Sequence, residues 1–127
     1  MNSQVAEAPT LAPDPCAWAV VSAETYLNKK NGERVERECR DRLDAGCQAL
    51  VINFQQTSQV NSIGISILLS VIDAARLSDA RLIFAGVNEH TVQLFELLGL
   101  TRHVALARDE HEAVLSLVGV EHTVGVS

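Results

Sequence analysis

The chain has 127 residues, of which 47% are apolar and 20% charged, a composition typical of a globular domain with its own core. Its net charge of −6 argues against a nucleic-acid partner, because neutralising phosphates requires a basic patch that the sequence lacks. The longest apolar stretch, Ile63 to Ile72, is too short to span a bilayer, so we expect no membrane insertion.

The N-terminal segment, residues 1–15, contains all three prolines among small and polar residues, which predicts a flexible tail. It lacks the basic and apolar regions of a secretory signal. The three cysteines are an odd number at wide spacing, which favours reduced thiols over a disulfide framework. These features together predict a cytoplasmic protein.

Apolar runs and helical periodicities follow one another through the rest of the chain. The pattern predicts, in order, a strand over 17–23, a loop over 24–32 closed by Asn31-Gly32, a helix over 33–45 ended by Gly46, a strand over 49–54, a helix beginning at Asn61 or Ser62 and ending near Leu77, a strand over 81–87, a helix over 89–98 capped by Asn88, a short strand over 102–107 and a helix over 109–118. Residues 119–127 are predicted to form a C-terminal tail.

This alternation predicts an α/β domain over residues 16–118. Strands separated by helices form a mostly parallel sheet, because each helix carries the chain back to the same edge. We therefore expect a mixed but mostly parallel sheet of four to five strands with flanking helices.

Residues 49–77 are the most informative stretch. On a helical wheel at about 100° per residue, Ser62, Ser66, Ser70 and Asp73 form one narrow polar stripe on an otherwise apolar helix. Ser62 is at the helix start, where free backbone N–H groups favour an anion such as a phosphate. The simpler interpretation is that Ser62 only caps the helix and that the other serines fill a tight packing surface.

Several enzyme motifs are incomplete. No glycine-rich nucleotide loop is present. The segment His111-Glu112 resembles a zinc-protease motif, but Leu115 occupies the position of the second His. Around Ser62, the Gly-x-Ser-x-Gly nucleophile motif has Val60 at its first position. We therefore predict no catalytic residues, no metal and no cofactor, and a small hydrolase using Ser62 is the least favoured interpretation.

Two segments of the chain resemble the STAS domain of bacterial anti-sigma factor antagonists. In that family a strand leads through a loop into a helix that begins Asp-Ser-Ser/Thr-Gly-Leu. Here the corresponding helix begins Asn61-Ser62-Ile63-Gly64-Ile65. A later strand over 81–87 and the following segment 92–100 also resemble the family pattern, so the resemblance covers roughly residues 17–118.

The resemblance implies a non-enzymatic module that binds a protein partner and takes part in signal transduction and transcription regulation by partner switching. The phosphorylated serine of the family falls on Ser62. A kinase of the anti-sigma type would phosphorylate Ser62 and thereby block docking, and a phosphatase would restore it. The residues expected to bind the partner are Asn28, Asn61, Ser62, Gly64, Ser66, Ser70 and Asp73.

This sequence departs from the family pattern at three positions. Asn61 replaces the acid before the serine, Ile63 replaces the hydroxyl after it, and Asn28 replaces an acid in an earlier loop. The changes remove negative charge near Ser62. The main alternative is therefore a STAS scaffold or subunit of a larger signalling or lipid-transport complex that binds without being phosphorylated. The sequence does not predict the oligomeric state.

Two substitutions test these expectations. Ser62→Asp should weaken partner binding and leave the fold intact, because it places a negative charge on the docking surface. Gly64→Val should destabilise the domain, because the first turn of the helix is expected to pack closely on its neighbours.

Overall fold

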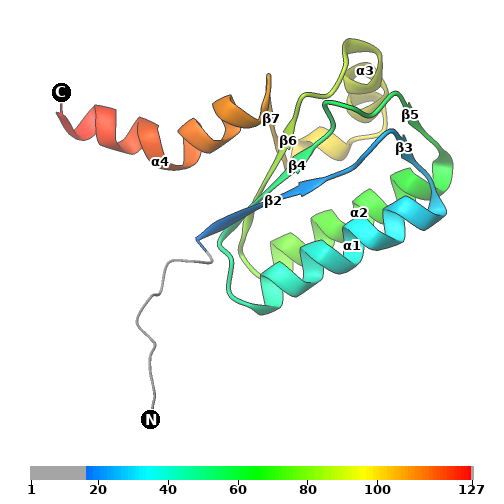
Figure 1. Cartoon of the computed structure of the whole chain (residues 1–127), viewed down its shortest axis with the longest axis horizontal. Helices are drawn as coiled ribbons and strands as arrows, with labels where there is room; N and C mark the ends of the chain where they lie inside the picture. Colours follow the sequence, from blue (N-terminus) through cyan, green and yellow to red (C-terminus); the bar gives the residue numbers. More distant parts are fainter. Residues whose placement is uncertain (1–16, 127) are drawn as a thin grey trace, which may run out of the picture.

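The computed structural model describes residues 17–126, with side chains as far as Val118, so the predicted N-terminal tail lies outside the described residues. Figure 1 shows the elements in space. In chain order they are β2 (Trp18–Ser22), β3 (Tyr26–Leu27), α1 (Lys29–Asp44), β4 (Ala49–Asn53), β5 (Gln59–Val60), α2 (Ser62–Leu77), β6 (Arg81–Ala85), α3 (Glu89–Leu97), a short 3-10 turn η3 (Leu100–Arg102), β7 (Ala105–Ala107) and α4 (Glu110–Val126).

The main sheet has four strands in the order β2-β4-β6-β7, and every neighbouring pair is parallel. Strand order therefore follows sequence order, and α1, α2 and α3 are the crossovers that parallel pairing requires. The predicted α/β architecture with a mostly parallel sheet is confirmed. A second, two-stranded parallel sheet pairs β3 with β5.

Helices cover both faces of the main sheet. Figure 1 shows α1 and α2 side by side on one face and α4 across the other. The strand residues alternate accordingly: Leu50 and Ile52 belong to the larger core under α1 and α2, whereas Val51 belongs to the smaller core under α4. Parallel strands buried on both faces have nearly continuous apolar sequences, as β4 does.

Three phenylalanines hold α3 to the sheet. Phe54, Phe84 and Phe95 are fully buried, with ring centroids 5.1 to 5.7 Å apart in edge-to-face geometry. Phe95 comes from α3, Phe84 from β6, and Phe54 directly follows β4. The position of α3 relative to the carboxyl ends of the strands is therefore set by the core.

The structure differs from the sequence predictions at two helix boundaries, and also in the strand β3 inside the predicted loop 24–32 and in a last strand shortened to β7. The predicted loop closed by Asn31-Gly32 is wrong, because both residues lie inside α1, which begins at Lys29 after the N-cap Asn28. Gly32 packs closely against α2 there, since a Cβ at this position would be 2.7 Å from the Cδ1 of Ile67. At the other end, α4 continues past Val118 to Val126, through residues predicted to be a tail.

Candidate protein-docking site

The start of α2 is fixed by Asn61. Its side-chain oxygen accepts a hydrogen bond of 2.8 Å from the backbone N–H of Gly64, which makes Asn61 the N-cap and leaves Ser62 as the first helical residue. The backbone N–H of Asn61 donates to the carbonyl of Leu27 at 3.1 Å. The first turn of α2 is therefore tied to the short β3–β5 sheet.

Ser62 is exposed in this first turn. Its hydroxyl makes no hydrogen bond to any residue that the structure describes, so the Ser62 side chain is free to contact another molecule. The neighbouring Ile63 is 46% exposed, which is unusual for a large apolar side chain. The two residues place a hydroxyl and an apolar group together on the surface.

Gly64 is buried directly below. A Cβ at this position would be 2.3 Å from the backbone carbonyl oxygen of Leu27, closer than any side chain tolerates. The glycine thus allows the backbone of α2 to approach the strand β3. Its role is to set the position of Ser62, and it offers no side chain to a partner.

The predicted polar stripe is divided by the structure. Ser66 and Asp73 are exposed on α2, and Leu69 between them is 44% exposed. Ser70 instead points toward α1, where its hydroxyl donates to Glu36 at 2.7 Å and accepts from Arg40 at 2.9 Å. The hydrogen bond from Ser70, followed by the nearby Arg40, lowers the pKa of Glu36 despite some desolvation.

Asn28 lies at the start of α1. It caps α1, and its side-chain oxygen accepts from the backbone N–H of Asn31 at 3.0 Å. Tyr26 joins the two helix starts, since its carbonyl accepts from the Asn31 side chain and its hydroxyl lies 3.5 Å from the Asn61 amide nitrogen. The starts of α1 and α2 therefore form one structural unit.

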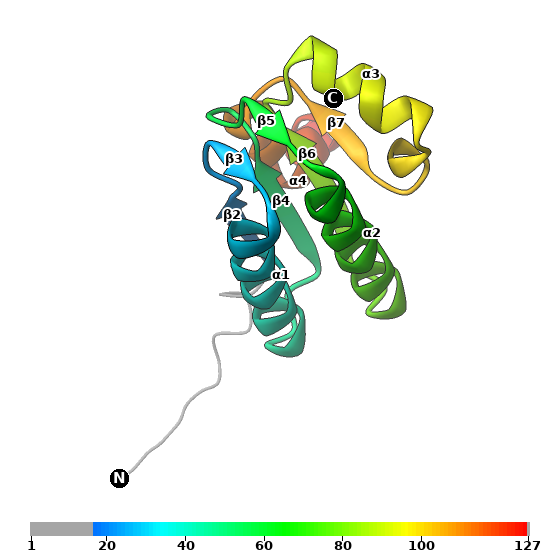
Figure 2. The same cartoon turned by 90° about the vertical axis from the view of Figure 1, so that its right-hand side faces the viewer.

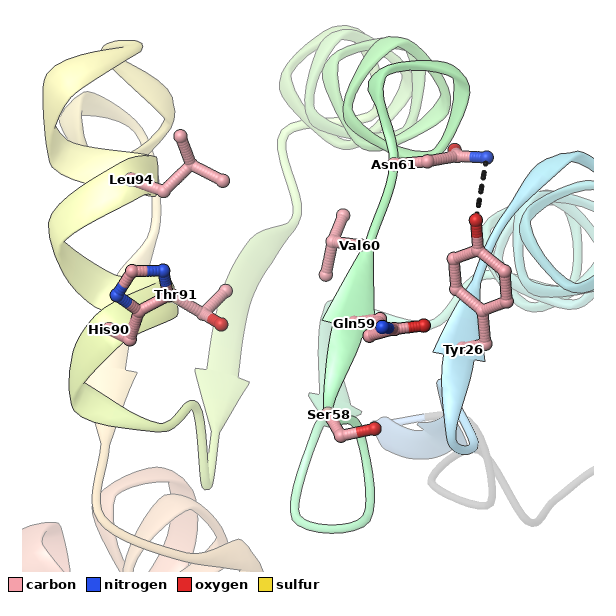
Figure 3. Close-up of a pocket in the computed structure, with 8 residues that line it drawn as sticks. All are labelled: Tyr26, Ser58, Gln59, Val60, Asn61, His90, Thr91 and Leu94. Carbon is pink, nitrogen blue, oxygen red and sulfur yellow. Dashed lines mark hydrogen bonds between the residues drawn. The ribbon is translucent and has the colours of Figure 1, made fainter.

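A groove runs between this unit and α3. Figure 3 shows His90, Thr91 and Leu94 of α3 facing Val60 of β5 across it. The cavity drawn there has a volume of about 330 Å³ and is lined mainly by polar uncharged groups: Tyr26, Ser58, Gln59, Val60, Asn61, His90, Thr91 and Leu94. The adjoining part, toward the first turn of α2, has a volume of about 340 Å³, is mostly apolar and is lined by Val60, Asn61, Ser62, Ile65, Leu94 and Leu98. Ser62 thus forms part of the wall of an apolar groove.

The groove was not predicted from the sequence. The spacing of His90, Leu94 and Leu98 at four-residue steps places them on one side of a helix, and this pattern indicates one wall of the groove. What the sequence lacked was the position of α3 relative to β5. That position depends on the buried phenylalanine cluster, which joins residues far apart in the chain.

The described residues around Ser62 include no metal-ligand cluster and no hydrogen-bonded base. Within residues 17–126, no group of three or more His, Cys, Asp or Glu residues could hold a metal ion. No histidine or carboxylate is hydrogen-bonded to Ser62 in the described part of the chain, so nothing there activates it as a nucleophile. Burial raises the pKa of the Cys39 thiol to about 12, which makes this cysteine an inert core residue.

Comparison with known families identifies the class of protein. The STAS domain model matches residues 12–113, which is most of the chain, and the chain therefore belongs to the STAS domain family. No helix of the described residues is long and apolar enough to cross a membrane. A search of curated proteins gave no significant match.

Solved structures with the same fold include two forms of one regulator. The unphosphorylated anti-sigma factor antagonist SpoIIAA matches with a TM-score of 0.68 at 17% identity, covering 81% of this chain and 90% of that one. The phosphorylated form of SpoIIAA, described as a Bacillus cell fate determinant, matches with a TM-score of 0.64 at 18% identity, covering 80% of this chain and 91% of that one.

The STAS domain of a SulP transporter from Vibrio cholerae is similar to the same degree. Its TM-score is 0.67 at 17% identity, and the match covers 89% of this chain and 88% of that domain. Identities this low establish a shared fold and do not choose between a free regulator and a transporter domain.

Proposed function

We propose that this protein is a cytoplasmic, non-enzymatic regulator of the anti-sigma factor antagonist type, which docks a protein partner at the start of α2. The partner is an anti-sigma factor or a related serine kinase, and phosphorylation of Ser62 controls docking. The observation that carries the proposal is an exposed hydroxyl with no internal partner, at the first residue of a helix and on the wall of an apolar groove.

The physical basis is the effect of charge on this wall. A phosphate on Ser62 would add about two negative charges beside Val60, Ile65 and Leu98, and a partner covering the groove would have to desolvate them. The free N–H groups at the start of α2 would stabilise the phosphorylated form of the isolated protein. Both effects favour the undocked state after phosphorylation.

Ser66 and Asp73 extend the proposed docking surface along α2, and the exposed Leu69 lies between them. Asn28, Asn61 and Gly64 support it by holding the two helix starts in place. Ser70 contributes indirectly, because its hydroxyl is used by Glu36 and Arg40 of α1. Partner contacts are thus assigned to the exposed members of the predicted set.

The second candidate is a STAS scaffold or transport-complex subunit that binds without phosphorylation. It is favoured by the similarity to the SulP transporter domain and by the replacement of acids with Asn28 and Asn61 at the starts of α1 and α2. In this case the same groove would bind a constant partner, and Ser62 would act only as a small residue in the interface.

Phosphate incorporation separates the two candidates. The protein and its Ser62→Ala variant are incubated with ATP and with each anti-sigma-type kinase encoded in the same genome, and the products are mapped by mass spectrometry. The regulatory proposal predicts one phosphate on Ser62 and none on the variant. Absence of phosphate with every such kinase would favour the scaffold. In a separate assay, ester hydrolysis by the protein that is lost in Ser62→Ala would support the hydrolase interpretation.

A further inference from the structure

The charge around the docking site is unevenly distributed, and the first turn of α1 is basic. Lys29 and Lys30 are the only lysines of the chain, and both are exposed. Neither has an ion-pair partner among the residues that the structure describes. Cations at this position oppose the α1 dipole, which favours acidic residues in a first turn. Because these charges are unfavourable for the helix that carries them, they indicate an interaction with another molecule.

Helix geometry places Lys29 on the side of α1 that faces α2. Lys29, Glu33, Glu36 and Arg40 follow one another at steps of four, three and four residues, so they share one side of α1. Glu36 and Arg40 on this side contact Ser70 of α2. The two helices lie side by side and start at the same end of the domain (Figure 2).

The level of each residue along the helices follows from the rise of about 1.5 Å per residue. Counting back from the contact of Glu36 with Ser70, Lys29 is about 10 Å nearer the start of α1, and Ser62 is about 12 Å nearer the start of α2. The close approach of Gly32 to Ile67, between these levels, agrees with this alignment. Lys29 therefore lies level with Ser62 and Ile63.

The groove on the other side of Ser62 carries no carboxylate in its lining. The acids of α3, Glu89 and Glu96, are exposed and lie with Gln93 on the side of the helix away from Leu94. Glu33, one turn after Lys29 on the same side of α1, forms no ion pair with it within the described chain. The docking surface thus combines an apolar groove with a basic edge, in a protein of net charge −6.

We infer that the partner presents an acidic segment with a large apolar side chain: the apolar group enters the groove of Val60, Ile65, Leu94 and Leu98, and its carboxylates face Lys29. This inference rests on the proposed function and specifies the chemistry of its partner. A phosphate on Ser62 adds negative charge between the groove and the level of Lys29, and repels the acidic segment.

The test uses random peptides displayed on phage and selected against the immobilised full-length protein. Selected peptides are sequenced, and the consensus peptide is synthesised, labelled and titrated by fluorescence anisotropy. We expect a leucine, isoleucine, methionine or phenylalanine flanked by aspartate or glutamate. A consensus without acidic residues, or no enrichment at all, would overturn the inference.

Lys29→Glu is the informative variant, because an acid in the first turn suits the α1 dipole and should leave the fold stable in thermal unfolding. It should weaken binding of the consensus peptide by about tenfold and reduce the dependence of binding on salt. Arg37→Glu is the matched control: it is exposed on the same helix, about 12 Å further along, and should change affinity by less than about twofold. Equal affinities for the Lys29→Glu and wild-type proteins would contradict the basic edge.

Ser62→Asp in the same titration separates this inference from the proposed function. Loss of binding in Ser62→Asp without loss in Lys29→Glu would support docking at this site but would contradict an acidic partner. Loss of binding in Lys29→Glu alone would support an acidic partner and would contradict the control of docking by Ser62. The groove could also be occupied by a second copy of this chain, and sedimentation analysis tests for such a homodimer. A homodimer that dissociates on Leu94→Ser and prevents peptide binding would overturn the inference.

Discussion

At the scale of single residues, the site depends on small side chains and amide caps. Gly64 lets α2 approach the carbonyl of Leu27, and Asn61 holds the first turn by accepting from the N–H of Gly64. An asparagine cap serves the backbone as well as an aspartate does but adds no charge. The start of α2 is therefore well ordered and carries no acid of its own beside Ser62.

Gly64→Ala should destabilise the domain by about 1–3 kcal/mol, because the new Cβ would collide with the backbone carbonyl of Leu27, which cannot move aside as a flexible side chain could. Gly64→Val should cost more, since its branched side chain adds further clashes. Denaturant unfolding followed by circular dichroism measures the effect. Ser66→Ala, exposed one turn away on α2, is the control, and equal stability of the Gly64→Ala and wild-type proteins would refute the packing argument.

At the scale of secondary-structure elements, α1 and α2 act as a pair. Gly32 of α1 packs against Ile67 of α2, and the hydroxyl of Ser70 hydrogen-bonds to Glu36 and Arg40 of α1. These contacts set the position of the first turn of α1 relative to the first turn of α2. This arrangement makes the α1–α2 contact relevant to binding as well as to stability.

Ser70→Ala should lower stability at neutral pH by about 0.5–1.5 kcal/mol, since it removes a hydrogen bond to a carboxylate. The pKa of Glu36 is lowered in the folded state below its ordinary value of 4.5, mainly by Ser70. The stabilisation is therefore complete above pH 4.5 and is lost as the pH falls through the lower folded pKa.

The check is the free energy of unfolding of Ser70→Ala and wild-type proteins measured from pH 7 to about pH 3. The difference between them should shrink on acidification. Ser66→Ala should show no such trend, because the Ser66 side chain makes no hydrogen bond within the described residues. A difference that stays constant down to the lowest pH would show that Ser70 does not act through the ionised form of Glu36.

Local sequence patterns determined most of the elements. Apolar runs located the four strands of the main sheet, and Asn61 and Asn88 located two helix starts. Asn31-Gly32 was misassigned because this pair favours turns locally, whereas here Asn28 caps a helix that continues through both residues. Gly32 is buried against Ile67 of α2, a tertiary contact that the local pattern does not show.

At the scale of the whole molecule, the fold brings three crossover connections to one edge of the sheet. The starts of α1 and α2 and the groove beside α3 all lie near the carboxyl ends of the strands, where α/β proteins commonly bind ligands. The sequence predicted Ser62 and the α2 surface because both lie on one helix. It could not predict the groove or the position of Lys29, because these depend on how separate helices are placed by the core.

The most direct test of the account compares the affinity of the partner for the unmodified protein and for protein carrying phosphoserine at position 62, introduced during synthesis. The partner is first identified by co-purification and mass spectrometry, and both forms are checked for equal thermal stability. The account predicts that phosphoserine weakens binding by about tenfold or more. Equal affinities of the two equally stable forms would contradict it.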